Sequence, residues 1–418
     1  MGVGDSVRVN HHTKAPLAAL LVAACSSTVT TSAPEVPRVD AAVEERGSRD
    51  AEAVTAMTDV SDVFRCEAPD VAPPAIDAPP DAPPFVVEIA SAAQLHTCAR
   101  MSDGTLRCKG DNRQGVLGVP GVEVAERPVT VPGLVDVEQV VTSNLGATCT
   151  RHRDGRVRCW GSNRYALLGT GRVGDERCEG EPCRRAPTLV DRLDGVVHLA
   201  AGALDSMCAV RDDGTVWCWG TGGFPEALDD AARPTRLSNL RDVVWLQSTV
   251  PGWIMRLRDG SYRTTNNLRI EIPAEASLNV DSPSFHVCHR LPDTSARCAG
   301  SNARGQLGVG AAWPDRNDLT AYPPPLCGVR AMHTGAHHAC ALMLAGDVWC
   351  WGEGRGGIGA PATEDCGACA TRPQRVSGID RVTALFLGVW STWAIREDRT
   401  VWVWPDANGT DRPTRVEW

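Results

Sequence analysis

The stretch Cys208-Ala-Val-Arg-Asp-Asp-Gly-Thr-Val-Trp-Cys218-Trp-Gly220 decides the fold of this chain. Apolar and β-branched residues flank its Asp-Gly pair, a pattern typical of two antiparallel strands joined by a tight turn. The chain contains seven copies of this hairpin, aligned at Cys98, Cys149, Cys208, Ile254, Cys288, Cys340 and Trp393. Copies that recur every 34 to 59 residues indicate a repeat architecture.

The turn of the hairpin fixes which residues face each other. If Ser102, Asp103 and Gly104 form a three-residue loop with Gly104 in the left-handed conformation, Cys98 lies opposite Cys108. That pair occupies a non-hydrogen-bonded position, where Cα atoms are about 4.5 Å apart. This spacing suits a disulfide bond across the two strands.

Copies without cysteines test the pairing. In the fourth copy Ile254 faces Thr264, and in the seventh Trp393 faces Val403, so both cysteines of a pair are lost together. Buried free thiols would allow one partner to be lost alone, so paired loss favours disulfides. The expected hairpin disulfides are Cys98–Cys108, Cys149–Cys159, Cys208–Cys218, Cys288–Cys298 and Cys340–Cys350.

Two further cysteine pairs lie in equivalent loops of the second and sixth copies. They are Cys178 with Cys183 and Cys366 with Cys369. Zinc half-sites would have to meet across separate repeats, and thioredoxin-like redox chemistry needs a different fold. We therefore expect local disulfides at both pairs.

The 17 cysteines of the 418-residue chain indicate an oxidising compartment. After the pairs above, Cys25, Cys66 and Cys327 remain. A bridge between Cys66 and Cys327 would dock the preceding segment onto the repeats, and the sequence leaves this pairing open.

Residues 1–25 read as an export signal. A polar start with Arg8 and Lys14 precedes a short apolar run that is too short to span a bilayer. The segment Leu21-Val-Ala-Ala-Cys25 resembles a bacterial lipobox, which implies that Cys25 is lipidated and, with Ser26 next, that the protein is anchored at the outer membrane. The alternative is an ordinary secretory signal and a secreted protein.

Residues 26–84 are rich in Pro, Ala and Asp and carry a net charge of −8, from twelve acidic residues and four arginines. Such a composition cannot bury enough apolar surface to fold, so we expect a disordered tether. The whole chain has a net charge of −9, which leaves the remainder almost neutral. This balance argues against a nucleic-acid partner, which would require a basic surface.

Residues 85–418 hold the repeats. After each hairpin comes a Gly-rich loop and then an extended segment with proline, such as Arg233-Pro-Thr-Arg-Leu237. Another apolar strand leads into the next hairpin, so each unit has four short strands, and closing a ring removes exposed edges. Because the first unit begins at Phe85–Ser91 and lacks the proline-containing strand, we expect Arg412–Val416 to complete this unit and lock the ring.

The motif Cys-Ala-x-x-x-Asp-Gly-x-Val-x-Cys-Trp-Gly-x-Asn, followed by Gly305-Gln-Leu-Gly308, resembles the regulator of chromosome condensation repeat family in a bacterial, cysteine-rich form. The resemblance implies an all-β, seven-bladed β-propeller. The eukaryotic founder of the family is a nucleotide exchange factor, but no exchange residue can be carried over to this chain. A secreted bacterial propeller with similar repeats inhibits β-lactamases, so the fold can serve binding without catalysis.

Three histidines, His96, His286 and His338, sit two residues before a hairpin cysteine. A repeated position favours a structural role, because equivalent residues are spread around a ring and do not converge. His333 and His337 add a small cluster near His338, but no third-ligand spacing supports zinc. We predict no metal site.

Gly352-Glu-Gly-Arg-Gly-Gly357 matches the dinucleotide fingerprint. It lies where the fifth copy has Gly300–Gly305, a loop without the strand and helix that a dinucleotide site needs. We interpret it as a loop and predict no cofactor.

The copies also divide by one pair of positions. Where the second residue after the first aligned position is arginine, the ninth is arginine too, as at Arg107 and Arg158; where it is apolar, the ninth is Trp217, Trp349 or Trp402. Packing between repeats and solvated arginines would explain this. A contact surface with Trp and Arg anchors would explain it as well.

The sequence therefore predicts a non-enzymatic, monomeric lipoprotein whose propeller binds an unknown protein or an envelope polymer. Neither a nucleophile nor a pair of carboxylates recurs in the geometry that catalysis needs. The rival is a glycan hydrolase or lyase that uses carboxylates around the central channel. A purely structural envelope component is a third possibility.

Overall fold

The structure is a computed structural model. It describes residues 66, 83–91, 96–171, 176–202, 205–222, 224, 228, 230–250, 252–265, 272–281, 284–310, 312–322, 326–353, 369–405 and 412–418. The chain divides into the units Met1–Asp59 and Val60–Trp418, and all the described residues belong to the second. Cys25, the expected export signal and nearly all of the expected tether lie outside the described residues. In the part described, no helix is long and apolar enough to cross a membrane.

The regular structure of the described residues is entirely β, in seven sheets. Sheet 1 has β1 (Val86–Ser91), β2 (His96–Met101), β3 (Leu106–Asp111) and β4 (Val124–Thr130). Sheet 2 has β5 (Val137–Thr142), β6 (Ala147–His152), β7 (Val157–Ser162), β9 (Glu181–Leu189) and β8 (Glu176–Cys178). Sheet 3 has β10 (Val196–Ala201), β11 (Ser206–Arg211), β12 (Val216–Gly220) and β13 (Thr235–Arg236).

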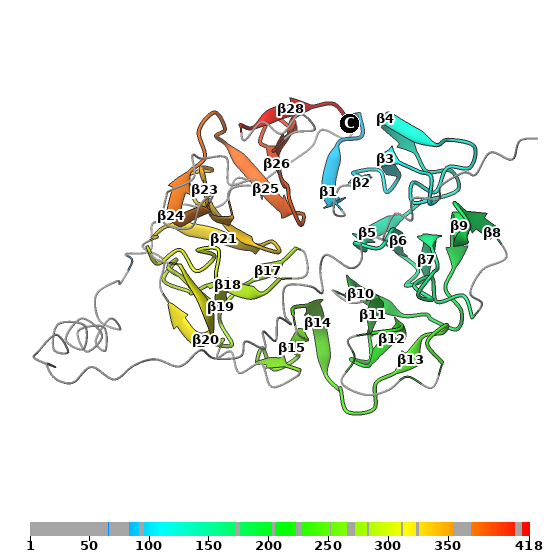
Figure 1. Cartoon of the computed structure of the whole chain (residues 1–418), viewed down its shortest axis with the longest axis horizontal. Helices are drawn as coiled ribbons and strands as arrows, with labels where there is room; N and C mark the ends of the chain where they lie inside the picture. Colours follow the sequence, from blue (N-terminus) through cyan, green and yellow to red (C-terminus); the bar gives the residue numbers. More distant parts are fainter. Residues whose placement is uncertain are drawn as a thin grey trace, which may run out of the picture. The chain divides into compact units, whose positions relative to one another are not determined.

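The remaining sheets follow the first three in chain order around the ring (Figure 1). Sheet 4 has β14 (Val243–Ser248), β15 (Trp253–Leu257) and β16 (Tyr262–Thr264), and sheet 5 has β18 (His286–Arg290), β19 (Ala296–Asn302) and β20 (Trp313–Tyr322). Sheet 6 has β17 (Asn279–Val280), β21 (Val329–Thr334), β22 (His338–Met343), β23 (Val348–Glu353) and β24 (Cys369–Arg375). Sheet 7 has β25 (Val382–Leu387), β26 (Thr392–Arg396), β27 (Val401–Trp404) and β28 (Thr414–Val416).

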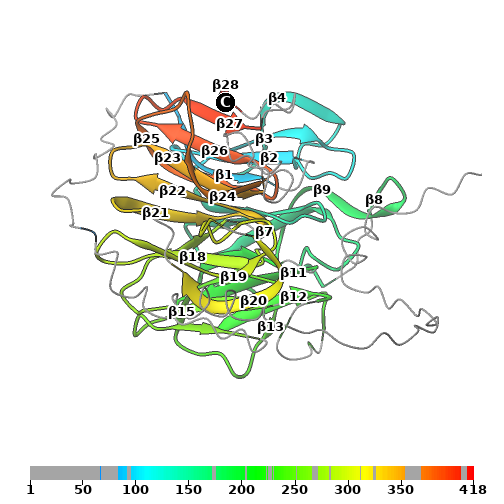
Figure 2. The same cartoon turned by 60° about the vertical axis from the view of Figure 1, so that its left-hand side comes forward.

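The molecule is an all-β propeller, but the prediction of seven equivalent blades is wrong. Six sheets are blades whose innermost strand pairs antiparallel with the hairpin. Sheet 5 lacks such a strand, because β17, which precedes its hairpin, pairs in parallel with β21 of sheet 6. Only 34 residues separate Ile254 from Cys288, too few for a full unit. Figure 2 shows β18 of this incomplete sheet beside β21.

The hairpins have the predicted register. Met101 N donates to Thr105 O at 2.9 Å, Gly104 has φ of 78°, and Cys98 pairs with Cys108. Five hairpin disulfides are present, Cys98–Cys108, Cys149–Cys159, Cys208–Cys218, Cys288–Cys298 and Cys340–Cys350. In the two copies without cysteines, the opposed pairs are Ile254 with Thr264 and Trp393 with Val403, as the spacing predicts.

The other cysteines are also paired where they are described. Cys178 is bonded to Cys183, and Cys66 is bonded to Cys327 across 261 positions of the sequence. Cys369 is disulfide-bonded, and its expected partner Cys366 lies outside the described residues. The question that the sequence left open is therefore settled: Cys66 is covalently joined to the segment just before β21.

Neighbouring sheets are joined by a tryptophan latch, formed by Trp160, Trp219 and Trp351. Each indole is fully buried and donates from Nε1 to a carbonyl in the Gly-rich loop of the preceding sheet, at 2.8, 2.7 and 2.7 Å. A glycine of that loop lies against the ring, and a Cβ atom on Gly308 would be 2.9 Å from Trp351 Nε1. The Gly-x-Leu-Gly loop of one sheet is thus shaped to receive the tryptophan of the next.

The expected closure of the ring by a shared strand is wrong. The C-terminal strand β28 pairs with β27 and completes sheet 7, not sheet 1. Sheet 1 already has its innermost strand in β1 and its outermost strand in β4, so no position remains for another strand. Side chains join the first and last sheets instead: Lys109 Nζ lies 4.7 Å from the Trp418 ring and 5.4 Å from the Trp393 ring, beside a shared apolar cluster.

The latch makes one glycine far less replaceable than another. Gly308 and Gly133 have φ of 71° and 72°, so alanine at either position meets the same left-handed backbone cost, but only Gly308 faces a tryptophan. We expect Gly308→Ala to lower the free energy of unfolding by about 1–3 kcal/mol more than Gly133→Ala does. Chemical denaturation of both variants measures this, and equal losses would contradict the latch.

Candidate functional site

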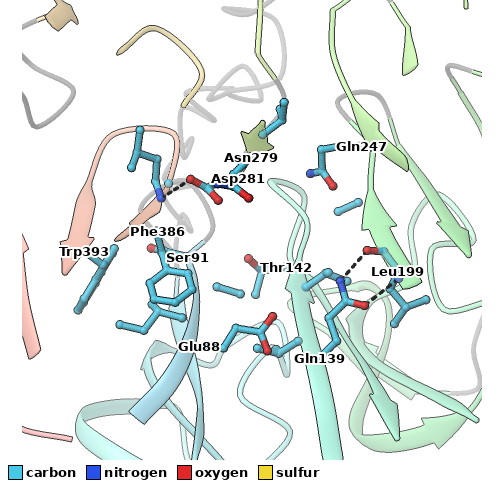
Figure 3. Close-up of a pocket in the computed structure, with 18 of the residues that line it drawn as sticks. Glu88, Ser91, Gln139, Thr142, Leu199, Gln247, Asn279, Asp281, Phe386 and Trp393 are labelled. Carbon is cyan, nitrogen blue, oxygen red and sulfur yellow. Dashed lines mark hydrogen bonds between the residues drawn. The ribbon is translucent and has the colours of Figure 1, made fainter. Parts of the chain in front are cut away.

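The channel between the innermost strands contains a cavity of about 200 Å³. Residues of β1, β5, β10, β14, β17 and β25 line it, and Figure 3 shows their side chains directed inward from several sheets. Each of the six innermost strands has a register shift near its start, as between Val86 and Glu88. Such a bulge re-aims the residue that follows it, and in sheets 1 to 4 that residue lines the cavity.

Polar side chains join neighbouring innermost strands around the channel. Gln139 of β5 donates from Nε2 to Leu199 O at 2.9 Å and accepts from Leu199 N at 2.8 Å. His198 of β10 lies 2.8 Å from Leu246 O of β14 through Nε2. These bonds satisfy edge groups of the next strand, so the channel wall is held by side-chain-to-backbone contacts.

Two carboxylates line the cavity, and both have partners. Glu88 accepts from Arg100 Nε at 2.9 Å, and burial raises the pKa of Glu88 against the opposing effect of Arg100. Asp281 Oδ2 lies 2.8 Å from His333 Nδ1 and accepts from Leu387 N at 3.3 Å. The arrangement holds both carboxylates at fixed positions on the wall, which suits recognition of a ligand by preorganised acceptors.

Two of the three predicted structural histidines connect sheets. His96 Nε2 lies 2.7 Å from Thr148 Oγ1 of the next sheet, and His338 Nε2 lies 3.0 Å from Thr392 Oγ1 of the next sheet. Burial lowers the pKa of His96 to about 4 and that of His338 to about 3. Both rings are therefore neutral at pH 7 and act as parts of the packing.

His286 occupies the same repeat position, but neither of its ring nitrogens has a hydrogen-bond partner within the residues that the structure describes. The reason is in the sequence: the residue of the next sheet that corresponds to Thr148 and Thr392 is Ala339, which has no hydroxyl. Among the described residues, no group of three or more His, Cys, Asp or Glu side chains could hold a metal ion.

A row of three aromatic side chains lies where the innermost strands end and the hairpins begin. We call Phe285, His337 and Trp390 the aromatic row. The rings of Phe285 and His337 stack at 5.3 Å and 11°, and His337 lies 5.5 Å from Trp390. Phe285 is 38% exposed, and the other two rings are half-buried.

The residues of the aromatic row lie outside the hairpin motif, but they share one position in the repeat. Phe285, His337 and Trp390 each stand three residues before the first aligned hairpin position, in the fifth, sixth and seventh copies. The corresponding residues of the first three copies are Leu95, Gly146 and Asp205. Equivalent positions in successive sheets place the rings side by side.

A charged pair adjoins the aromatic row. Arg304 Nη1 lies 2.8 Å from Glu353 Oε1, while Glu353 Oε2 is buried and has no hydrogen-bond partner in the described part of the chain. Glu353 N donates to His337 O at 3.0 Å, which fixes the carboxylate beside the row. Burial lowers the pKa of His337, so its ring is neutral.

The residues predicted as a possible contact surface are distributed over five sheets. Trp217, Trp349 and Trp402 lie in sheets 3, 6 and 7, where they are half-buried and pack against apolar clusters. Trp217 Nε1 donates to Thr215 at 3.0 Å and Trp402 Nε1 to Thr400 at 2.9 Å, each beside an arginine. Arg107 and Arg158 are half-buried in sheets 1 and 2.

Only the start of the Gly352–Gly357 fingerprint is described. Gly352 and Glu353 end β23, whose neighbours are antiparallel, and residues 354–357 lie outside the described residues. A dinucleotide fingerprint joins a strand to a helix within a parallel unit, and β23 has no such surroundings.

The histidine contacts lead to a matched test. His338→Ala removes the hydrogen bond between His338 Nε2 and Thr392 Oγ1, whereas His286→Ala removes an imidazole that has no hydrogen bond to the described residues. We expect His338→Ala to lower the free energy of unfolding by about 1–3 kcal/mol more than His286→Ala. Denaturant titrations of the two variants under non-reducing conditions measure the difference. A larger loss for His286→Ala would contradict this account.

The repeats are similar in sequence to those of known proteins. The family model of the regulator of chromosome condensation (RCC1) repeat matches residues 196–224. The human E3 ubiquitin-protein ligase HERC2 is 30% identical over 146 residues, which are 34% of this chain and 3% of HERC2. The human probable E3 ubiquitin-protein ligase HERC6 is 29% identical over 163 residues, which are 38% of this chain and 15% of HERC6. The chain thus spans only a small part of these relatives.

Solved structures include yeast RCC1 (Prp20) bound to Kap60, with a TM-score of 0.47 and 18% identity over 80% of this chain and 75% of that one. Human WBSCR16 has a TM-score of 0.44 and 17% identity, covering 80% and 82% of the two chains. The matched residues 196–224 run from β10 through the hairpin that the sequence repeats. Residues 196–224 of the chain are thus similar to an RCC1 repeat.

Proposed function

We propose that the propeller is a non-enzymatic binding scaffold that contacts a protein partner at the end of the sheets that carries the aromatic row. The observation that supports this most directly is the row itself. Its three rings come from three successive sheets: His337 stacks on Phe285 at 5.3 Å and lies 5.5 Å from Trp390 at a tilt of 35°, and Phe285 is 38% exposed. Aromatic rings offer a large, flat apolar area to a partner.

The polar surroundings of the row fit a protein contact. Aromatic and arginine side chains are the residue types that contribute most at interfaces, especially where water is excluded. Arg304 is half-exposed and held by Glu353, so it is placed beside the rings with little freedom left to lose. A partner with complementary apolar and acidic groups would bury both features at once.

The ubiquitin ligase activity named for HERC2 and HERC6 is not part of the proposal, because this chain matches 3% and 15% of those proteins. An envelope polymer is a second kind of occupant for the same surface. The rival enzyme hypothesis would use Glu88 and Asp281 of the channel, and their partners Arg100 and His333 favour binding over proton transfer.

The proposed location is outside the cytoplasm, with the protein monomeric and anchored to the outer membrane through lipid on Cys25. Seven described disulfides support export, because such bonds persist in oxidising compartments. Secretion without an anchor is the alternative.

Affinity capture from envelope extracts tests the binding proposal. We expect the native propeller to retain a protein from the extract. Phe285→Ala or Trp390→Ala should reduce the amount retained by roughly tenfold or more, as the loss of an interface anchor does. Val135→Ala is the matched control: Val135 is 65% exposed and precedes β5, at the opposite end of the sheets. Equal retention by all variants would exclude the aromatic row, and a retained glycan would identify the polymer instead.

Metabolic labelling with a fatty-acid analogue tests the anchor. We expect the label on the native protein and none on Cys25→Ser, with the variant moving from the membrane fraction to the soluble fraction. Export without label in the native protein would favour the secretory alternative.

A further inference from the structure

We propose that the central cavity is a binding site for a small aliphatic compound with primary ammonium groups. This inference does not depend on the proposed protein contact, because the cavity lies in the channel and the aromatic row lies at the end of the sheets. The lining residues come from strands of several sheets, namely β1, β5, β10, β14, β17, β25 and β26, so the site exists only in the assembled ring. Four features of the cavity carry the proposal.

The first feature is the excess of acceptors. Glu88 and Asp281 bring two carboxylates to the wall, and the Gln247 and Asn279 carboxamides are directed toward the same space (Figure 3). These oxygens enter from different sheets, and fixed acceptors from several directions suit a group that donates several hydrogen bonds. A primary ammonium, with three donors and no acceptor, is such a group.

The second feature concerns positive charge. Of the described residues that line the cavity, none is Lys or Arg. His198 is the basic residue of the lining, and burial lowers its pKa to about 4, so it is neutral at pH 7. Arg100 pairs with Glu88, while Asp281 has an imidazole and a backbone amide as partners. The cavity therefore favours cations.

The third feature is aromatic. Trp245 and Phe386 line the cavity from sheets 4 and 7, and ring faces attract ammonium groups. Trp393, on the same wall, already has a primary ammonium near its ring, since Lys109 Nζ lies 5.4 Å from its centroid. The wall thus combines carboxylates with aromatic rings, the combination that recognises organic cations.

The fourth feature is size. The cavity has a volume of about 200 Å³, below the roughly 300–1,000 Å³ of sites for drug-sized ligands. A short aliphatic diammonium fits this limit, and the proposal assigns one end to Glu88 and the other to Asp281. A bulky ligand would clash with the walls of the cavity, and an anionic ligand would be repelled by the carboxylates.

Calorimetric titration of the full chain with 1,4-diaminobutane tests the proposal, with tryptophan fluorescence as a second readout because Trp245 lines the cavity. We expect saturable binding, no binding of the neutral 1,4-butanediol and no binding of succinate. Asp281→Asn keeps the shape of the side chain and removes its charge, and we expect it to weaken binding by roughly tenfold or more. Binding of the diol with equal affinity, or no binding of the diamine, would overturn the proposal.

Glu126→Gln is the matched control, because it also removes a carboxylate charge but is exposed on β4, outside the cavity lining. We expect its affinity for the diamine to be unchanged. If Asp281→Asn fails to fold, Glu88→Gln gives the same test from the other wall. Equal weakening by the control and a cavity variant would show attraction by net charge alone and would overturn the site. Loss of the diamine with protein capture intact would separate this inference from the proposed partner contact.

Discussion

The propeller depends on side-chain contacts between sheets, because the first and last sheets share no strand. Sheet 1 is complete from β1 to β4, and sheet 7 is complete from β25 to β28. The ring is therefore held by indoles that enter the neighbouring Gly-rich loops, by His–Thr contacts and by Gln139 on the innermost strands. Each contact satisfies a buried polar group with a partner from the next sheet, so a sheet alone would leave that group without one.

The hairpin disulfides stabilise single sheets and do not join neighbouring sheets. Every hairpin disulfide lies within one sheet and cross-links the two strands of its hairpin. Where the seventh copy has Trp393 and Val403 instead, the indole reaches the seam and lies near Lys109 and Trp418. A disulfide there would have no aromatic face to offer, so the seam gains inter-sheet contact where the hairpin loses its cross-link.

Features set by local geometry were predictable from the sequence, and features set by the ring were not. The Asp-Gly turn and the ten-residue spacing determine the register of Cys98 and Cys108, because only one loop intervenes. The placement of β28 and β17 depends on which sheet edge is free, and this is known only after the sheets assemble. The channel site escaped prediction for the same reason, since Glu88 and Asp281 are far apart in the sequence and meet around the cavity.

Both proposed sites include polar or aromatic side chains from the irregular region at sheet 5. Because sheet 5 lacks an innermost strand, the segment before its hairpin is free to pair with β21, and this brings Asn279 and Asp281 to the channel. Asp281 then contacts both His333 of sheet 6 and Leu387 of sheet 7, contacts that an ordinary antiparallel blade would not make. Sheet 5 also begins the aromatic row. A repeat that departs from its own rule is where a scaffold acquires an asymmetric site, because strict repetition would distribute the same groups evenly around the ring.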